Sequence, residues 1–348
     1  MLDEPALQRI LAALPGLSIA VVGDLFLDKY LDLDGSLTES SVETGLDAYQ
    51  IVRVRCYPGA GGTVLNNLRA LGIGRLSAVS VIGDDGEGFE LLRALRDRHI
   101  DAEGIIVSRN RMTPTYTKPM LSRLDGPPRE LNRLDIKNRS APPALQDGDV
   151  IARLDAIASR VNAIIIADQV TERNHGVVTD AVRDHLSLLA QRHPQCIFLA
   201  DSRSHIGHFR NVLAKPNMHE LLGAVGRSQD AATLSPANRP AVVWAASSQL
   251  SRRTGRAVFT TLGPDGILCA SGETACQIPG IAVNGPTDIV GAGDSTTAGI
   301  VSALCAGATH AQAAHLGCLV ASITIQQLGV TGTATPEQVL ARFREAHI

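Results

Sequence analysis

Aromatic residues, strong net charge and long apolar runs are all scarce in this sequence. Aromatic side chains make up 3% of the 348 residues, and Trp244 is the one tryptophan, so the chain offers no platform on which nucleic-acid bases stack. A net charge of −3 gives no general attraction to nucleic acid or to an anionic membrane. No apolar run approaches the length of a membrane-spanning helix. We therefore expect a small-molecule partner, no nucleic acid and no membrane.

The sequence also lacks the short patterns of several common site types. Its six cysteines show no C-x-x-C spacing, which argues against a zinc site and a disulfide framework. No glycine is followed by lysine, so a Walker-type phosphate loop is absent, and no glycine-rich segment completes a dinucleotide-binding fingerprint. The first residues include Asp3 and Glu4 and lack the cationic start and apolar core of a signal peptide. These features favour a reduced, cytoplasmic protein that is neither a dehydrogenase nor a Walker-type ATPase.

Short apolar segments alternate with helical periodicity along most of the chain. Hydrophobic residues make up 45% and charged residues 19% of the sequence, which permits a large buried core. The expected strands are Ser18–Gly23, Leu76–Ile82, Val161–Ala167, Cys196–Ala200, Val212–Ala214, Ala241–Ala245 and Ala257–Leu262. The expected helical segments between them include Val64–Leu71, Gly88–Arg98, Gly176–Gln191 and Ala311–Leu328. This alternation is typical of an α/β fold in which a mostly parallel central sheet carries helices on both faces.

Two segments, at about 28–57 and 113–135, are strand-like, more polar and poor in helical periodicity. We expect them to form a small β lid over a single domain that spans residues 1–348. Pro142-Pro143 and Ser235–Pro240 are expected to be surface loops within that domain.

The most informative segment is Asn284–Asp294, which runs into the small residues Ser295–Ile300. Gly291 and Gly293 around Ala292 permit a tight turn with outward-facing N–H groups, and the helix expected behind them favours anions at its N-terminus. Asp294 lies at the edge of this cradle, where a carboxylate can accept a proton from a hydroxyl that attacks a phosphoryl group. The same residues also fit an ordinary strand-to-helix turn with an acidic capping residue.

Three further motifs follow expected strands, where ligands of α/β sheets collect. Asp24 comes directly after the first strand and is able to accept hydrogen bonds from sugar hydroxyls. The segment Pro58–Thr63 is glycine-rich and precedes a helix, so it permits close approach of a ligand to the backbone. Asn217 and Glu220 share one face of a helical turn, near which phosphates or metal-bound water can be held. Each motif taken alone also fits a turn or a helix cap.

In this order, over about residues 17–340, the motifs resemble the ribokinase-like (PfkB) family of carbohydrate kinases. Asp288–Asp294 is similar to the C-terminal family signature of the form D-T-V-G-A-G-D. Within the family, the chain most resembles the heptose-7-phosphate kinase domain of the bifunctional ADP-heptose synthesis protein. The supporting segments are Val21–Asp24 with Leu27–Tyr30, Thr117-Lys118 with Asn132–Asp135, and Lys215–Asn217 with Glu220. Because the chain stops after one kinase-sized domain, we expect the second activity of that bifunctional protein to be absent.

The resemblance implies transfer of the γ-phosphate of ATP to a sugar hydroxyl with the help of Mg²⁺. Asp294 would be the catalytic base, and the backbone of Gly291, Ala292 and Gly293 the anion hole. Substrate contacts are implied for Asp24, Asp28, Gly59, Gly61, Gly62, Thr63, Lys118, Arg133 and Asp168. Nucleotide contacts are implied for Asn217, Glu220, Thr261, Gly263 and Gly266, with Asn217 and Glu220 near Mg²⁺ through water. Asp288 and the carbonyl of Val290 match a monovalent-cation (K⁺) site of many members.

The acceptor is left open by departures from the family pattern. Thr63 stands where members commonly carry asparagine at the sugar-binding turn, and the lysine that heptose kinases carry a few residues after Asp168 has no equivalent. Lys118 and Arg133 flank the expected lid, and Arg203 follows a strand, so three cations can converge on a substrate phosphate; each also fits a solvated surface charge. A sugar or sugar phosphate is expected, with a nucleoside kinase or a non-catalytic sugar- or nucleotide-binding protein as alternatives. We expect a homodimer that forms through the lid.

Overall fold

The main body of the molecule is a mostly parallel sheet. The computed structural model describes residues 2–123, 126–141, 144–229 and 235–346. The nine-stranded sheet has the order β14-β13-β12-β11-β10-β9-β1-β4-β5, in which β13 and β14 are antiparallel additions at one edge. Its strands are β1 (Ser18–Gly23), β4 (Arg75–Gly83), β5 (Asp101–Ser108), β9 (Ala163–Asp168), β10 (Ile197–Ser202), β11 (Leu213–Ala214), β12 (Val258–Thr261), β13 (Ile267–Ser271) and β14 (Thr274–Ile278).

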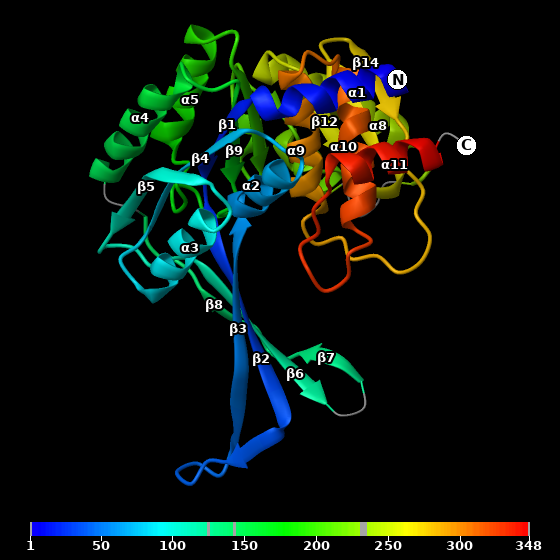
Figure 1. Ribbon diagram of the computed structural model, residues 1–348. Helices are drawn as coiled ribbons and strands as arrows, with labels where there is room; N and C mark the ends of the chain where they lie inside the picture. The colour runs from blue at the N-terminus through cyan, green and yellow to red at the C-terminus, as the bar shows by residue number, and fades with distance from the viewer. Residues whose placement is uncertain (1, 124–125, 142–143, 230–234, 347–348) are drawn as a thin grey trace.

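Helices cover both faces of this sheet, because alternate residues of its buried strands point to opposite faces. In β9, Ile165 packs into one core cluster and Ile166 into the other. The first cluster includes α1 (Glu4–Ala13), α2 (Gly61–Ala70), α3 (Gly86–Arg96), α9 (Ala292–Cys305), α10 (His310–Thr324) and α11 (Pro336–Ala346). The second includes α4 (Ala144–Ala158), α5 (Asp180–Arg192), α6 (Met218–Ala224) and α8 (Arg239–Thr254). The α/β fold with helices on both faces is thus confirmed (Figure 1).

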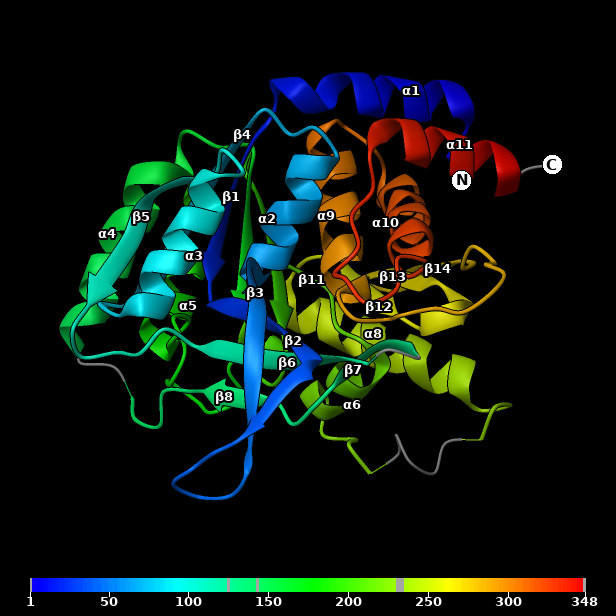
Figure 2. The same cartoon turned by 60° about the horizontal axis from the view of Figure 1, so that its bottom comes forward.

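The two terminal helices lie side by side on the first face (Figure 2). Arg344 in α11 forms an ion pair with Glu4 in α1, with 2.7 Å between Nη2 and Oε1. None of the helices in the described ranges is both long and apolar enough to cross a membrane.

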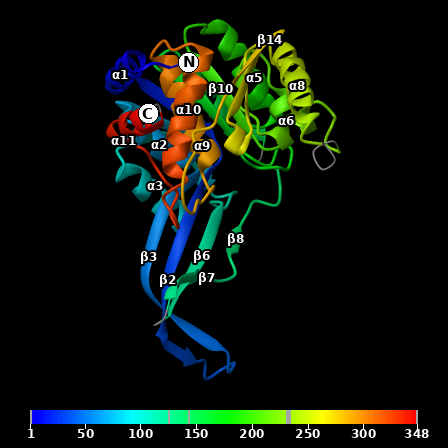
Figure 3. The same ribbon diagram turned by 90° about the vertical axis from the view of Figure 1, so that its right-hand side faces the viewer.

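A second sheet projects from the body (Figures 1 and 3). Its order is β3-β2-β6-β7, and β8 pairs with β6. The strands are β2 (Leu25–Ser40), β3 (Asp47–Ala60), β6 (Thr115–Arg123), β7 (Gly126–Glu130) and β8 (Leu134–Ile136). Asp24 alone separates β1 from β2, and α2 follows β3 directly, so the ribbon is rooted at the carboxyl ends of the main strands. This root is where a ligand of an α/β sheet is expected.

One expected strand is wrong. Residues Ala241–Ala245 lie inside helix α8, which has a proline in its first turn and ends at Gly255 in the left-handed region with φ 72°. A short apolar run fits a buried strand and a buried helix equally well, and the neighbouring helix signals decide between them. The expected surface loop Ser235–Pro240 ends earlier, since α8 begins at Arg239. Pro142-Pro143 lies outside the described residues.

Candidate active site

The glycine-rich segment begins helix α9. Gly291 is its N-cap with φ 79° and ψ 2°, a left-handed conformation that favours glycine. A methyl group at Gly291 would lie 2.8 Å from Cγ2 of Thr331 and 3.4 Å from Cγ2 of Thr63. Ala292 donates its N–H to the carbonyl of Ile289 at 3.1 Å, so this amide already has a partner. The first-turn N–H groups that follow have no carbonyl partner within the helix, and such groups favour anions.

A buried charged cluster lies against this helix start. Asp201, near the end of β10, pairs with Lys215 after β11, with 3.0 Å between Oδ2 and Nζ. Thr297 of α9 also donates its hydroxyl to Oδ2 of Asp201 at 3.1 Å. The Nζ atom of Lys215 lies 3.7 Å from the position of a Cβ atom on Gly293. A buried ammonium and two strand ends therefore meet the N-terminus of α9.

Asp294, in the first turn of α9, is a much weaker acid than an ordinary aspartate. Burial, followed by repulsion from Asp201, raises the pKa of Asp294 to about 7, although Lys215 and Arg203 act in the opposite direction. Burial alone would lower the pKa of Lys215, but the surrounding carboxylates, Asp201 first, outweigh it and raise that pKa. A carboxylate whose pKa lies near neutrality is suited to accept a proton from an alcohol.

The turn before α2 lies beside this cluster. Helix α2 begins at Gly61, whose N–H bonds to the carbonyl of Asp24 at 3.0 Å. A Cβ atom at Gly61 would lie 3.1 Å from Cβ of Ala167, and one at Gly62 would lie 2.4 Å from Cβ of Pro58. These glycines let α2 pack tightly on the ends of β1 and β9, and this packing places the buried Thr63 next to Gly291.

Asp28 and Lys118 meet at the root of the second sheet. Their carboxylate and ammonium are 3.2 Å apart, and Lys118 also donates to the hydroxyl of Tyr30 at 3.1 Å. Burial would lower the pKa of Lys118, but Asp28 and Tyr30 outweigh it and raise that pKa. Asp28 is close enough to contribute to the raised pKa of Asp294. Gly59 lies in the same corner, because its Cβ position is 2.5 Å from Oδ2 of Asp28.

Arg133 is bound by its own neighbour. Its guanidinium donates twice to Asp135, at 2.7 and 2.9 Å, and lies 4.2 Å above the ring of Tyr116. Arg203 donates to the side-chain carbonyl of Gln169 at 2.9 Å, and its positive charge acts to lower the pKa of Asp294. Of the three expected phosphate-binding cations, Arg203 acts on Asp294 through its charge, Lys118 pairs with Asp28, and Arg133 pairs with Asp135.

Asp24 is buried and both of its carboxylate oxygens accept backbone hydrogen bonds. Oδ2 accepts from Gln169 and Val170 at 2.8 and 3.0 Å, and Oδ1 accepts from Val177 at 2.8 Å. Burial and the nearby charge of Asp168 raise the pKa of Asp24 to about 6 despite these bonds. In this structure Asp24 holds the loop after β9 in place, and its contact with a sugar stays a prediction.

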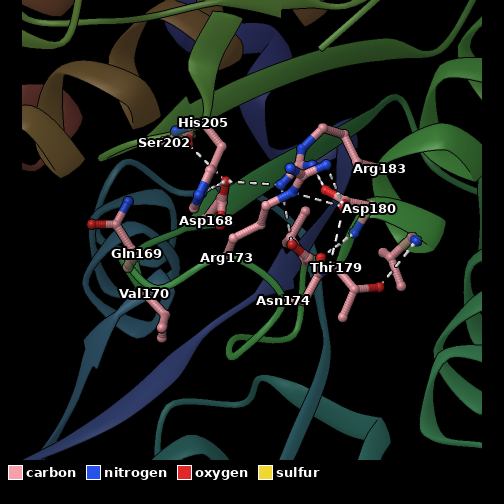
Figure 4. Close-up of polar contacts among 12 residues, drawn as sticks. Asp168, Gln169, Val170, Arg173, Asn174, Thr179, Asp180, Arg183, Ser202 and His205 are labelled. Carbon is pink, nitrogen blue, oxygen red and sulfur yellow. Dashed lines mark hydrogen bonds and ion pairs between the residues drawn. The ribbon is translucent and has the colours of Figure 1, made fainter. Parts of the chain in front are cut away.

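The structure does not bring Asp168 to the cradle. Asp168 lies on the face of the sheet that carries Ile166 and α5, whereas Asp201 points to the α9 face. Ser202 donates to Oδ2 of Asp168 at 2.7 Å, and Arg183 and His205 lie 3.7 and 3.5 Å from the same oxygen. Figure 4 shows Asp168 in this polar cluster, which is linked through Arg183 to residues at the start of α5.

The expected nucleotide residues lie together on the other side of Lys215. Asn217 and Glu220 form a reciprocal cap of α6, at 2.9 and 2.8 Å. The backbone of Asn217 forms an isolated parallel β-bridge with Thr261, and the turn Gly263–Asp265 follows Thr261 closely. Gly263 and Gly266 have φ values of 59° and 88°. A Cβ atom at Gly266 would lie 2.0 Å from the carbonyl oxygen of Ile278, so this position requires glycine.

Oxygen atoms suited to cations lie at two places. Burial raises the pKa of Glu220, and the charge of Asp201 adds to this effect, so a neighbouring cation would favour the ionised form of Glu220. Asp288 accepts a hydrogen bond from the N–H of Val290 at 3.0 Å and therefore holds its own loop. The described residues contain no group of three or more His, Cys, Asp or Glu side chains that is arranged to hold a metal by itself.

Sequence reasoning gave no role to Lys215 or Asp201. Lys215 was visible as one of four lysines, and both residues follow apolar strand segments. The available signal was therefore a rare charged residue at the carboxyl end of an expected strand.

Comparisons with known proteins point to sugar kinases. Residues 202–338 match the model of the pfkB family of carbohydrate kinases. The bifunctional protein HldE of Trichlorobacter lovleyi is 27% identical over 359 residues, which cover 99% of this chain and 67% of that protein. The chain thus spans about two thirds of the length of this curated relative.

Solved structures share the fold at low sequence identity. Phosphofructokinase-2 from Escherichia coli in complex with potassium superposes with a TM-score of 0.68 at 17% identity, over 95% of this chain and 100% of that chain. Arabidopsis thaliana ribokinase complexed with ribose and ATP gives a TM-score of 0.65 at 16% identity, over 94% and 99% of the two chains. These likenesses show the ribokinase-like fold. The family match over residues 202–338, the similarity to HldE along nearly the whole chain and this shared fold together support a carbohydrate kinase of the pfkB type.

Proposed function

We propose that this kinase transfers the γ-phosphate of ATP to a hydroxyl group of a sugar or sugar phosphate, with Asp294 as the base. The observation that carries the proposal is the position of Asp294 in the first turn of α9, with a pKa of about 7. The carboxylate lies beside N–H groups that favour the negative charge of a phosphoryl group. In a loose transition state the hydroxyl proton leaves late, so a well-placed weak base is sufficient.

The backbone from Gly291 to Gly293 would form the anion hole. Because Ala292 donates its N–H to Ile289, the adjacent Gly293 amide and the ammonium of Lys215 are the donors that we assign to the transferred phosphoryl group. Lys215 is buried and held by Asp201, so its charge is fixed in position before the nucleotide binds. A fixed donor needs no reorganisation during the reaction.

We assign the triphosphate to the edge formed by Asn217, Glu220, Thr261, Gly263 and Gly266. Asn217 and Glu220 fit Mg²⁺ held through water, because Mg²⁺ typically keeps several waters and binds one or two carboxylates together with phosphate oxygens. When bound, Mg²⁺ would neutralise the developing charge on the phosphates. Asp288 and the Val290 carbonyl supply hard oxygen atoms of the kind that K⁺ takes.

We further propose that residues 1–348 act as one kinase domain in which the second sheet is a lid that excludes water. The outer part of the ribbon exposes apolar side chains, among them Leu46, Ile51, Val52 and Val54. Strand β3 is also the end strand of this sheet in the described part of the chain. An exposed apolar edge favours pairing with a second copy, so we propose a homodimer through the lid.

The corner that holds Asp28, Lys118 and Gly59 supports a phosphorylated acceptor. Asp28 is suited to accept hydrogen bonds from sugar hydroxyls, and Lys118 is a partly buried cation beside it. A phosphorylated sugar would gain a charge-assisted contact with Lys118, whereas a nucleoside would not. ADP release measured over sugars, sugar phosphates and nucleosides distinguishes these acceptors.

The test of the base is Asp294→Asn, with Asp184→Asn as the matched control on an exposed site of α5. Asparagine keeps the shape of the side chain and cannot accept the proton, so kcat should fall by about 10²–10⁴. ATP affinity should persist in both variants, and the control should keep its kcat. Turnover close to that of the parent in Asp294→Asn would reject the assignment.

A further inference from the structure

Two of the six cysteines lie opposite one another in the main sheet. Cys269 in β13 and Cys276 in β14 are direct partners in the antiparallel register, and both are free thiols. Directly opposite residues project from the same face of the sheet, with Cα atoms about 4.5–5.5 Å apart. A disulfide spans Cα separations of about 4.4–6.8 Å. The register therefore brings these two thiols within bonding reach without any change in strand pairing.

The two thiols differ in their access to solvent. Cys269 is buried in the core with 5% of its surface exposed, whereas Cys276 is exposed on β14, the end strand of the sheet. Burial, and then the charge of the nearby Cys276, raises the pKa of Cys269 to about 12. Cys276 is thus the thiol that a reagent in solution reaches first. Cys269 can then react with the mixed disulfide that forms on Cys276.

We propose that Cys269 and Cys276 are a modification site that forms a reversible disulfide by exchange with a small-molecule disulfide. The Cys276 thiolate attacks one sulfur of the reagent, which gives a mixed disulfide and releases one half of the reagent as a thiolate. Cys269 then loses its proton to solvent and attacks Sγ of Cys276, which releases the second half. Two protein thiols are oxidised, and one reagent disulfide is reduced to two thiols.

The position of the pair gives the disulfide a local consequence. Cross-linking would tie the end strand β14 to β13. The same two strands meet at Ile267 and Ile278, directly beside the Gly266 turn. Cys56 provides a contrast, because it is partly exposed on β3 and lies opposite Lys29, so it has no thiol across from it.

The test is to incubate the full chain with oxidised glutathione, alkylate the remaining thiols, and measure the intact mass and the linked peptides. The parent should carry two alkyl groups fewer than the untreated chain, through a Cys269–Cys276 link that dithiothreitol reverses. Cys269→Ala should instead retain glutathione on Cys276. Cys276→Ser should show neither product at this hairpin, and Cys56→Ser should behave as the parent.

Thermal melting of each variant establishes that it is folded, and Cys276→Ser alters only an exposed side chain. A parent chain that keeps glutathione on Cys276 would overturn the proposal, because it would show that Cys269 does not resolve the mixed disulfide. A parent chain that forms no Cys269–Cys276 link, or that links Cys276 to another cysteine, would overturn it as well.

Discussion

Replacing Asp294 with asparagine should stabilise the folded protein at alkaline pH. Burial and the neighbouring Asp201 raise the pKa of Asp294 from 3.8 to about 7. One pKa unit corresponds to about 1.4 kcal/mol, so a shift of about three units sets an upper limit of about 4 kcal/mol for the cost of ionising this group in the folded state. Because the side chain is only partly shielded from water, we expect a gain of about 1–2 kcal/mol for the variant.

The gain should depend on pH with a definite sign. The folded-state pKa lies above the unfolded one, so folding strengthens proton binding at this carboxyl. The associated stability is fully present below about pH 4 and is lost as pH rises through about 7. Asparagine does not ionise, so the free energy of unfolding of Asp294→Asn relative to the parent should increase from about pH 4 to about pH 7 and then stay constant.

Urea unfolding of the parent, Asp294→Asn and the control Asp184→Asn at pH 5 and pH 8 measures this difference. Asp294→Asn should be more stable than the parent at pH 8, by a larger margin than at pH 5, and the control should show no such change. A variant that is less stable than the parent at pH 8, or a margin that does not change with pH, would refute the reasoning. Either result would mean that burial does not destabilise the charged carboxylate.

Three further predictions concern residues around the cradle. Gly291→Ala places a methyl group 2.8 Å from Thr331 at a φ of 79°. The free energy of unfolding, measured with urea, should therefore fall by about 1–3 kcal/mol. Steady-state kinetics should show a kcat at least about ten-fold lower. Thr63→Asn replaces a single buried hydroxyl with a larger amide next to Gly291, so kcat/KM for the preferred acceptor should fall about ten-fold or more. An unchanged value would show that Thr63 does not contact the acceptor. Lys118→Ala should raise KM for a phosphorylated acceptor far more than KM for ATP, and equal effects on both would argue against a sugar phosphate.

Local sequence was sufficient for the elements whose structure depends on nearby residues. The short apolar segment Ser18–Gly23 is β1 as expected, because a strand buried on both faces needs apolar residues throughout. The helix start at Gly291 was also readable, because its left-handed backbone favours glycine and the small residues after it allow close packing. The family resemblance rests on the same local motifs.

Tertiary structure decided which charged groups meet. Asp201 and Lys215 are joined because β10 and β11 pair in parallel and bring their carboxyl ends together, which neither segment specifies alone.

The separation of Asp168 from Asp201 shows most clearly that tertiary structure decides which charged groups meet. Asp168 is the last residue of β9 and Asp201 the next-to-last residue of the neighbouring β10. Asp168 pairs with Arg183 on the α5 face, whereas Asp201 meets Thr297 on the α9 face. Successive side chains along a strand point to opposite faces of the sheet. Which face carries α9 is set only when the helices pack, so the sequence alone identified the carboxylates, and the packed sheet determined which of them lies beside Asp294.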